Sequence, residues 1–173
     1  LIKALTFGGH EKTYQSWFGV TKEQLLENRR QNPYTYENEI DNYKQDHYQF
    51  HWNQKLNQKW STNLGLNYTY GRGYFEQFRD DDSIETYGGI VVSDIDQQGN
   101  KTGTTDLIRR RWLDNNFYVL NASANYKTSK LNLTFNSSFS SYSGDHYGEV
   151  IWARNFNKNS SVRDRYYKGN GKK

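Results

Sequence analysis

Residues 45–74 read QDHYQFHWNQKLNQKWSTNLGLNYTYGRGY, and apolar and polar side chains alternate in two long runs of this stretch. The first apolar set is Tyr48, Phe50, Trp52 and Leu56, and the second is Trp60, Leu64, Leu66, Tyr68 and Tyr70. Asn, Gln, His and Gly residues occupy most of the positions between them. Because successive side chains of a strand point to opposite faces of a sheet, Gln45–Tyr74 is predicted to be two amphipathic strands joined by a minimal turn at 57–59.

The length of these runs points to a membrane. Each run extends for about ten residues, whereas strands of soluble proteins usually have about five or six. A tilted strand needs about nine to eleven residues to cross a bilayer. The Asn, Gln, His and Gly face suits a water-filled lumen better than a packed core. From this hairpin alone, a soluble antiparallel sheet with one solvated face is an equal alternative.

The composition of the 173-residue chain favours a folded protein with thin apolar surfaces. Hydrophobic residues make up 34% and aromatic residues 17%, and a disordered chain would be poor in aromatics. Amphipathic rings are typical of the interfacial girdles of membrane barrels and of carbohydrate-stacking surfaces. The basic residues behind the net charge of +4 are scattered, so no nucleic-acid partner is expected. The absence of Cys excludes disulfides and thiol chemistry, and no apolar run is long enough for a transmembrane helix.

Long connections separate the remaining predicted strands. A strand at Leu1–Phe7 opens as though in mid-strand, so we expect residues 1–173 to be a partial β-barrel domain from a longer protein. A connection from Gly8 to about Asn42 includes a short helix after Thr21, since Thr21 and Gln24 have the spacing of a capping box. A second connection begins near Gly71 and carries short strands at 87–95 and 106–112 around a hairpin turn at 97–100.

The last two long strands repeat the pattern of the first hairpin. Residues 114–127 and 131–140 alternate in the same way and flank a minimal turn at 128–130. The segment from Gly144 to Lys173 is predicted to be a third long connection.

Long and short connections therefore alternate along the chain. In an up-and-down meander, all the long ones lie at one end of the sheet and both tight turns lie at the other. Outer-membrane barrels have this arrangement, with long extracellular loops and short periplasmic turns. The predicted fold class is all-β: an antiparallel up-and-down meander that is an incomplete arc of a large transmembrane β-barrel. Its five predicted strands are too few to close a barrel, which needs at least about eight.

Several loop segments resemble the barrel of Bacteroidota-type TonB-dependent outer-membrane receptors. These segments are Phe7-Gly8-Gly9-His10-Glu11, Thr13-Tyr14-Gln15-Ser16-Trp17, Asn32-Pro33-Tyr34-Thr35-Tyr36-Glu37-Asn38-Glu39, Asp41-Asn42-Tyr43-Lys44-Gln45-Asp46-His47-Tyr48-Gln49 and Ile108-Arg109-Arg110-Arg111-Trp112-Leu113. The resemblance implies a plugged barrel of about 22 strands in the cell outer membrane, surrounded by lipid. It also implies a TonB-type energising partner that acts through a plug outside these residues. The imported solute would be an iron chelate, a vitamin or a glycan.

Aromatic side chains of the predicted loops are the first candidates for contact with a small-molecule or glycan ligand, because rings above a barrel mouth can stack on sugars or planar chelates. They are Tyr14, Trp17, Phe18, Tyr34, Tyr36, Phe75, Tyr142, Tyr147 and Trp152. Packing of the loops against one another is the alternative for each. The strand aromatics Trp52, Trp60, Tyr68, Tyr70, Tyr118 and Tyr126 are instead predicted to form interfacial girdles.

A few polar residues are further candidates for ligand contact. His47 and His51 share a strand face about 14 Å apart, so they are expected to line a lumen and not to share a metal. Arg109, with Arg110 and Arg111, could clamp an anionic ligand, but alternation sends Arg110 to the other face, so a role facing the surface or lipopolysaccharide is an equal alternative. Asp80-Asp81-Asp82 is more typical of a solvated loop than of a calcium site, and the Asp94–Gly99 stretch fits a hairpin turn better than a calcium loop.

No nucleophile with a base, no pair of catalytic carboxylates and no phosphate loop can be assembled, so neither enzymatic activity nor a cofactor is expected. Three functions remain open at this stage. The first is part of an energised outer-membrane importer. The second is a passive porin-like barrel, and the third is a soluble carbohydrate-binding β-sheet.

Overall fold

The structure is a computed structural model that describes residues 1–14, 20–30, 34–87, 92–157 and 165–172. Its strands are β1 (Ile2–Tyr14), β2 (Ile40–Lys55), β3 (Trp60–Ser83), β4 (Thr104–Lys127), β5 (Asn132–Ala153) and β6 (Arg165–Lys172). The helical elements are α1 (Lys22–Glu27) and the short 3-10 helix η1 (Ile84–Tyr87). The all-β prediction is therefore confirmed.

The six strands form one antiparallel sheet in the order β1-β2-β3-β4-β5-β6. Every strand pairs with its neighbour in sequence, so the predicted up-and-down meander is confirmed. Within the described residues β1 does not pair with β6, and the sheet is an open arc. The predicted count of five strands is wrong, because the segment after Gly144 contains the end of β5 and then β6.

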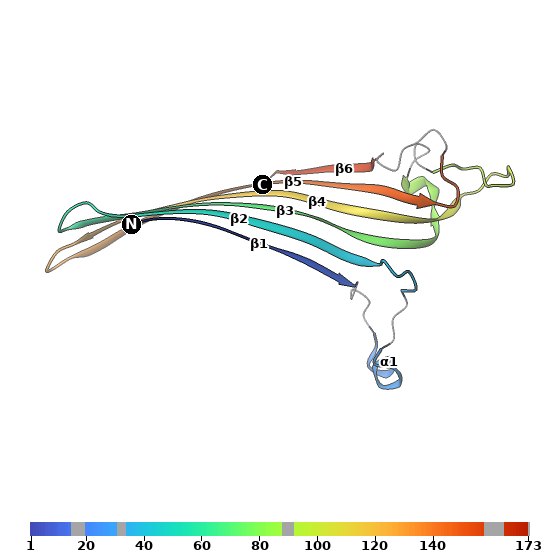
Figure 1. The fold of residues 1–173 in the computed structure, drawn as a ribbon, viewed down its shortest axis with the longest axis horizontal. Coiled ribbons are helices and arrows are strands. Elements are labelled where there is room, and N and C mark those ends of the chain that lie inside the picture. Colours follow the sequence, from blue (N-terminus) through green and yellow to red (C-terminus); the bar gives the residue numbers. More distant parts are fainter. Residues whose placement is uncertain (15–19, 31–33, 88–91, 158–164, 173) are drawn as a thin grey trace.

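Both predicted tight turns are present, and they lie at the same end of the sheet (Figure 1). Between β2 and β3, Asn57 Oδ1 accepts hydrogen bonds from the backbone nitrogens of Lys59 at 2.8 Å and Trp60 at 2.9 Å. Between β4 and β5, the Thr128 backbone nitrogen donates to the Leu131 carbonyl at 2.7 Å. The described parts of the long connections gather at the opposite end, as the alternation of connection lengths predicts (Figure 1).

The strands continue well past the amphipathic runs, and the predicted ends near Gly8, Gly71 and Gly144 are wrong. In the structure β1 reaches Tyr14, β3 reaches Ser83 and β5 reaches Ala153. Hydrophobic alternation stops there, but cross-strand pairs of charged and aromatic side chains take over. Glu76 bonds Arg110 at 2.7 Å, and the Tyr74 and Trp112 rings lie 4.6 Å apart between centroids. Such pairs stabilise a ladder without an apolar face.

The excursion between β3 and β4 differs from its prediction. Residues 106–112 are not a separate strand but the first part of β4. Instead of a strand at 87–95, the described residues have only isolated bridges, from Val92 to Phe156 and from Ile95 to Lys101. The predicted turn at 97–100 is confirmed, and Gly99 has φ 86° there, a left-handed value that glycine adopts without strain.

Helix α1 begins as the sequence predicts. The Gln24 backbone nitrogen donates to Thr21 Oγ1 at 3.3 Å, and the Thr21 backbone nitrogen donates to Gln24 Oε1 at 2.9 Å. This reciprocal capping box satisfies two donors that the first helical turn leaves unpaired. The helix has no buried residue and hangs away from the sheet on its connection (Figure 1).

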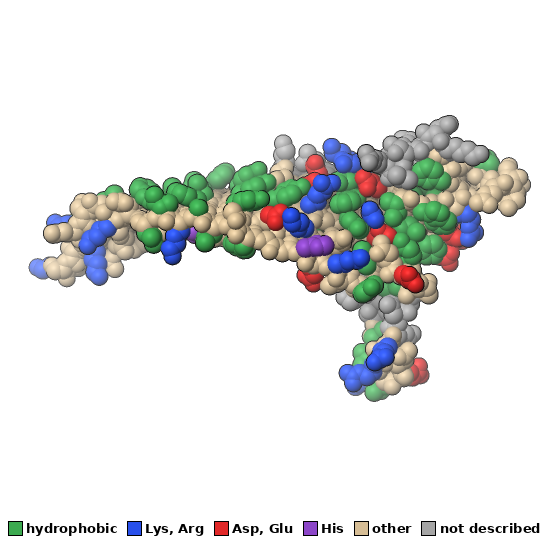
Figure 2. All heavy atoms as spheres, in the orientation of Figure 1, with side chains coloured by type: hydrophobic (Ala, Val, Ile, Leu, Met, Phe, Trp, Pro, Cys, Tyr) green, Lys and Arg blue, Asp and Glu red, His purple; other side chains and the backbone are tan. Residues whose placement is uncertain are grey.

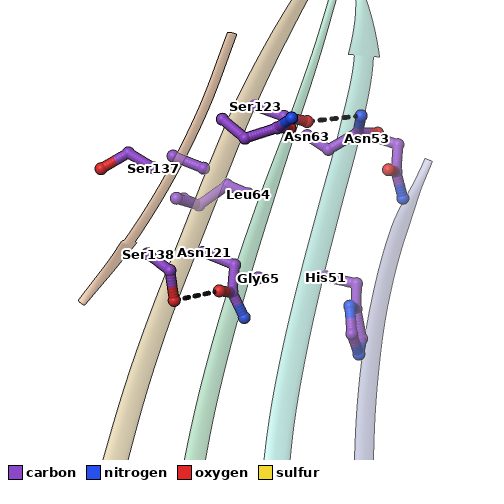
Figure 3. A pocket seen from close by; sticks show the side chains of 11 residues that line it. His51, Asn53, Asn63, Leu64, Gly65, Asn121, Ser123, Ser137 and Ser138 are labelled. Carbon is purple, nitrogen blue, oxygen red and sulfur yellow. Dashed lines mark hydrogen bonds between the residues drawn. The ribbon is translucent and has the colours of Figure 1, made fainter. Parts of the chain in front are cut away.

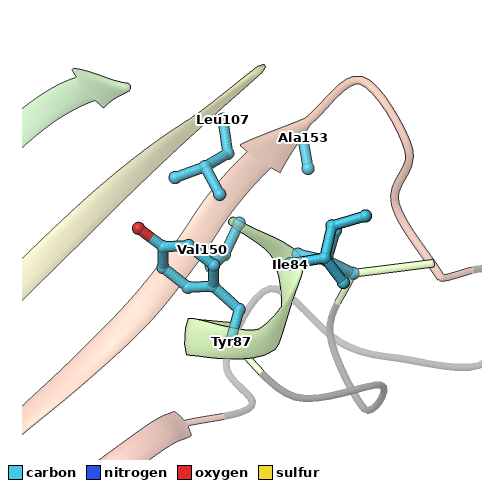
Figure 4. Close-up of a cluster of buried hydrophobic side chains, with 6 residues drawn as sticks. Ile84, Tyr87, Leu107, Val150 and Ala153 are labelled. Carbon is cyan, nitrogen blue, oxygen red and sulfur yellow. The ribbon is translucent and has the colours of Figure 1, made fainter. Parts of the chain in front are cut away.

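A small hydrophobic core lies at the end of the sheet that carries the long connections (Figure 4). Its members are Ile84, Tyr87, Val92, Leu107, Val150 and Ala153. The cluster fixes η1 and Val92 against β4 and β5. No helix in the described part of the chain has the length and apolar character to span a membrane.

Candidate functional site

The pairing register gives the sheet two faces of different chemistry, because residues opposite each other in adjacent antiparallel strands point to the same face. We call the side that carries His47, Asn67 and Asn121 the polar face, and the side that carries Phe50, Leu66 and Leu120 the apolar face. The register puts the odd-numbered residues of β2, β4 and the part of β3 before its β-bulge on the polar face and the even-numbered ones on the apolar face. For example, His47 pairs with Thr69, and Leu66 pairs with Phe50 and Leu120. The face assignment of the central hairpin is thus confirmed.

The polar face is free of charged side chains over a large area. This area comprises the odd-numbered residues of Tyr43–Asn53 on β2, Asn63–Gly73 on β3 and Leu113–Ser123 on β4, and the even-numbered residues of Asn136–His146 on β5. None of them is Asp, Glu, Lys or Arg, although these types make up 24% of the chain. The surface instead offers amides, hydroxyls, imidazoles and aromatic rings.

One row across five strands of the polar face is largely aromatic. The register aligns Phe7, His47, Thr69, Phe117 and Tyr142 side by side. The Phe7 and His47 rings stack with their centroids 4.7 Å apart, and His47 Nδ1 lies 3.0 Å from Thr69 Oγ1. Phe7 is 53% exposed, so this row presents ring surface to the solvent on the polar face.

Glycines in the next rows let tyrosine rings lie against the sheet. A β-carbon at Gly71 would come within 2.9 Å of Tyr43 Cζ, and one at Gly144 would come within 2.7 Å of Tyr142 Cζ. Any other residue at these positions would push the rings away. The Tyr142 hydroxyl also donates to Asn115 Oδ1 at 2.6 Å, which fixes that ring. These rings and the aromatic row line a hollow of about 650 Å³, which we call the aromatic hollow.

A second hollow of about 460 Å³ follows on the polar face toward the tight turns, and we call it the amide hollow (Figure 3). Ser138 Oγ donates to Asn121 Oδ1 at 2.7 Å, and Asn63 Nδ2 donates to Ser123 Oγ at 3.0 Å. His51 also lines this hollow. Asn121 belongs to both hollows, so they form one continuous polar strip.

The apolar face carries two rows of aromatic rings. Tyr68 stacks between Tyr48 and Tyr118, with centroid distances of 5.7 Å and 4.8 Å. Toward the tight turns, Trp60 packs on Tyr126 at 4.9 Å. Between the rows this face carries no charged residue on β1 to β5. Figure 2 shows hydrophobic side chains gathered along one side of the arm that ends in the tight turns.

A buried carboxylate fastens the segment before β2 to β3 on the apolar face. Glu76 is 1% exposed and accepts hydrogen bonds from the Tyr36 hydroxyl at 2.6 Å, Asn38 Nδ2 at 2.7 Å and Arg110 Nε at 2.7 Å. Burial opposes the ionisation of Glu76, but these bonds together hold its pKa below the usual value. Burial and the bond to Glu76 raise the pKa of Tyr36 to about 12.

A second polar network fixes η1 on the polar face. The Tyr87 hydroxyl donates to Asp82 Oδ2 at 2.7 Å and accepts from Arg109 at 2.9 Å. Arg79 donates to the same carboxylate at 3.0 Å, while Arg109 also bonds Gln77. Burial opposes the ionisation of Asp82, yet the hydrogen bonds from Arg79 and Tyr87 lower its pKa. Burial raises the pKa of Tyr87 above its ordinary value.

The structure does not bring the predicted ligand-contact residues together. His47 lines the aromatic hollow and His51 lines the amide hollow. Arg109 is on the same face but is engaged by Gln77 and Tyr87. Arg110 lies on the opposite face, as alternation predicts.

The predicted aromatic contacts in the described residues are spread over both faces of the sheet and the connections. Tyr36 bonds Glu76, and Tyr147 is 2% exposed beneath Trp112 and the Arg165 guanidinium. Trp152 and Tyr14 pair with Ile108 and Ile40 and are 45% and 75% exposed. Tyr34 lies half-buried in the connection before β2, and Trp17 and Phe18 lie outside the described residues. Phe75 lies on the polar face against Arg111, and only Tyr142 joins the histidines at the hollows.

The acidic loop segments have structural roles in the described residues. Asp96 Oδ1 accepts from the backbone nitrogens of Gln98 at 2.9 Å and Asn100 at 2.7 Å, so the hairpin-turn prediction holds. Asp81, at φ 47°, occupies the bulge between Arg79 and Asp82. The described part of the chain contains no group of three His, Asp or Glu side chains that could hold a metal ion.

Sequence reasoning missed three rings of the aromatic hollow: Phe7, Tyr43 and Phe117. The sequence pattern places Phe7 only in a terminal strand, and the register of that strand against β2 depends on residues about forty positions away. One signal was available, because Tyr43 and Phe117 share the odd phase of the polar runs. Comparison with protein-family models, curated proteins and solved structures finds no match for this chain.

Proposed function

We propose that this chain forms part of the barrel wall of an outer-membrane importer of the TonB-dependent type, with the polar face lining the passage and the apolar face in lipid. The observation that carries the proposal is the uncharged band between the two aromatic rows of the apolar face. Membrane barrels have such a band, flanked by girdles of aromatic residues at both interfaces.

The height of the band supports the proposal. Trp60 and Tyr68 are eight residues apart on β3, and Tyr126 and Tyr118 are eight apart on β4. At about 3.4 Å per residue, eight residues extend about 27 Å, and a tilt of about 40° leaves a height of about 21 Å. With the widths of the rings themselves, this approaches the apolar band of about 25 Å in outer-membrane barrels.

The two ends of the sheet support an orientation. The tight turns would face the periplasm, and the long connections, with α1 and the small core of η1, would face the outside. Open sheet edges are not tolerated in hydrocarbon, so further strands must pair with β1 and β6 to close the wall. The solute would cross against the polar strip, and a TonB-type protein acting through a plug would supply the energy.

Cysteine labelling of intact cells tests the membrane assignment and the orientation. The chain has no Cys, so Gln98→Cys in the long-connection hairpin and Gln58→Cys in a tight turn each introduce a single thiol into it. Each is placed in the full-length gene product and expressed in a Gram-negative host. A membrane-impermeant maleimide is expected to label position 98 in intact cells and position 58 only after lysis. Equal labelling of both, or recovery in the soluble fraction, contradicts the proposal.

Liposome swelling separates the importer from a passive porin. Proteoliposomes of the full-length protein are placed in isotonic stachyose, a neutral sugar. A plugged importer admits no sugar without its energising partner, so no swelling is expected. Swelling at the rate of a general porin favours the passive barrel, while a monomeric protein that folds without detergent favours the soluble carbohydrate-binding sheet.

A further inference from the structure

We propose that the aromatic hollow is a subsite for one ring of a neutral oligosaccharide, and that the amide hollow takes the neighbouring sugar. This inference rests on the proposed function only in placing the hollows on the passage. The binding chemistry itself follows from the residues of the polar face.

The rings of the hollow are oriented to stack. Tyr43 lies over Gly71 and Tyr142 lies over Gly144, so each ring lies close to the backbone, and both rings line the hollow. The C–H groups on one side of a pyranose ring are apolar and pack against such a face. Phe117, which is 39% exposed, adds a third aromatic surface in the same row as Tyr142.

Amide and hydroxyl groups surround these rings. Gln45, Asn115 and Thr69 line the hollow, and each combines with its neighbours to offer both donors and acceptors. Asn67 Nδ2 donates to Thr69 Oγ1 at 3.1 Å, whereas its buried Oδ1 accepts no hydrogen bond from the described residues. Sugar hydroxyls provide donors and acceptors at once.

The absence of charge selects against ionic ligands. A site for an anionic ferric chelate needs Arg or Lys to pair with the ligand. The arginines of β4 on the polar face, Arg109 and Arg111, lie beyond the hollow and bond Gln77, Tyr87 and Tyr167. The described residues that line the hollow thus include no counter-charge for an anion and no carboxylate for a cation, although Glu11 lies opposite Tyr43 on β1.

The size of the two hollows fits more than one sugar. The aromatic hollow, at about 650 Å³, is within the range of about 300–1,000 Å³ found for ligand pockets. Asn121 lines both hollows, so a chain of sugars can continue from the rings into the Asn and Ser groups of the amide hollow.

Binding to an oligosaccharide array tests the proposal. The full-length protein in detergent is applied to neutral oligosaccharides, such as the hexamers of maltose, cellulose, xylan and mannan series, and to trigalacturonate and a ferric tris-catecholate. Binding to at least one neutral oligosaccharide and to neither anionic probe is expected. Binding confined to the anionic probes, or to no probe, overturns the proposal.

Variants of the hollow locate the binding. For a neutral oligosaccharide that binds, Tyr142→Ala is expected to weaken the affinity about tenfold, and Tyr142→Phe, which keeps the ring, by less than about threefold. Tyr14→Ala, at a 75% exposed tyrosine that lines neither hollow, is the matched control and is expected to have no effect. If Tyr142→Ala lowers the thermal unfolding temperature, Gln45→Ala replaces it, with a loss of about fivefold. Unchanged affinity in the hollow variants overturns the assignment.

The subsite and the membrane wall can fail independently of each other. If the protein is soluble and binds neutral oligosaccharides through Tyr142, the subsite is supported and the membrane wall is contradicted. If the protein inserts in the outer membrane but binds only anionic probes, the membrane wall is supported and the subsite is contradicted.

Discussion

Leu64→Arg is the substitution for which the proposed membrane wall and a soluble sheet give the most different results. Leu64 lies on the apolar face of β3, four residues from Trp60 and four from Tyr68. At about 3.4 Å per residue, each aromatic row is about 14 Å away along the strand, so Leu64 would lie at the bilayer midplane in the proposed wall. An arginine on the lipid face at that depth costs about 2–4 kcal/mol of folding free energy.

Two further arginine substitutions test whether the stability cost depends on the face of the sheet and on the depth in the bilayer. Asn63→Arg, on the polar face beside Leu64, is expected to change the free energy of unfolding by no more than about 0.5 kcal/mol, because its side chain is exposed. Tyr70→Arg, on the apolar face but beyond the Tyr68 row, is expected to cost about 0–1 kcal/mol, since charged residues are tolerated near the interface.

The assay is urea unfolding of the full-length protein folded in phospholipid vesicles, followed by tryptophan fluorescence. The expected order of destabilisation is Leu64→Arg first, then Tyr70→Arg and Asn63→Arg. A Leu64→Arg variant as stable as Asn63→Arg in lipid refutes the assignment of the apolar face to the bilayer. If Leu64→Arg does not fold at all while Asn63→Arg does, the face dependence is already established.

Three more changes probe the local interactions. Glu76→Gln is expected to cost the segment 34–39 about 2 kcal/mol of local stability, seen as faster amide hydrogen exchange. Because the pKa of Glu76 is held below its ordinary value of 4.5, this stabilisation is fully present above about pH 4.5 and is lost as the pH falls further. Amide exchange of the wild-type segment, corrected for the intrinsic rate, should therefore rise in acid, while that of the variant should change little. Thr21→Ala should cost α1 about 1 kcal/mol, a roughly fivefold faster exchange of its first-turn amides, whereas Thr21→Ser should not. Gly71→Ala should displace the Tyr43 ring that covers it and weaken neutral-oligosaccharide binding, and Gly103→Ala, whose β-carbon would have no neighbour within 4 Å and which lines neither hollow, should leave it unchanged.

The sequence predicts best what depends on neighbours along the chain. The two strands around the turn at 57–59 follow from their alternation, because one wet and one apolar face impose a period of two. The start of α1 follows from Thr21 and Gln24, which satisfy backbone donors three residues apart. The segregation of tight turns from long connections follows from these elements together.

The sequence does not predict features that depend on pairing between strands far apart in the chain. Beyond Gly71, β3 is held by pairs such as Glu76–Arg110, which are 34 residues apart and leave no hydrophobic alternation to detect. The aromatic row has the same origin, since only the register of β1 on β2 brings Phe7 to His47. The candidate hollows were therefore visible in composition, as Asn, Gln and aromatic residues, but not in their arrangement.

The most direct test of the central claim is the accessibility of spin labels along β3. Single cysteines are introduced at each position from 62 to 69, labelled with a nitroxide, and studied in the full-length protein in lipid vesicles. We expect contact with dissolved oxygen, which concentrates in lipid, to peak at positions 62, 64, 66 and 68. Contact with a water-soluble nickel chelate should peak at 63, 65, 67 and 69. A chelate that reaches both sets equally would show that neither face lies in lipid, and the membrane wall would have to be abandoned.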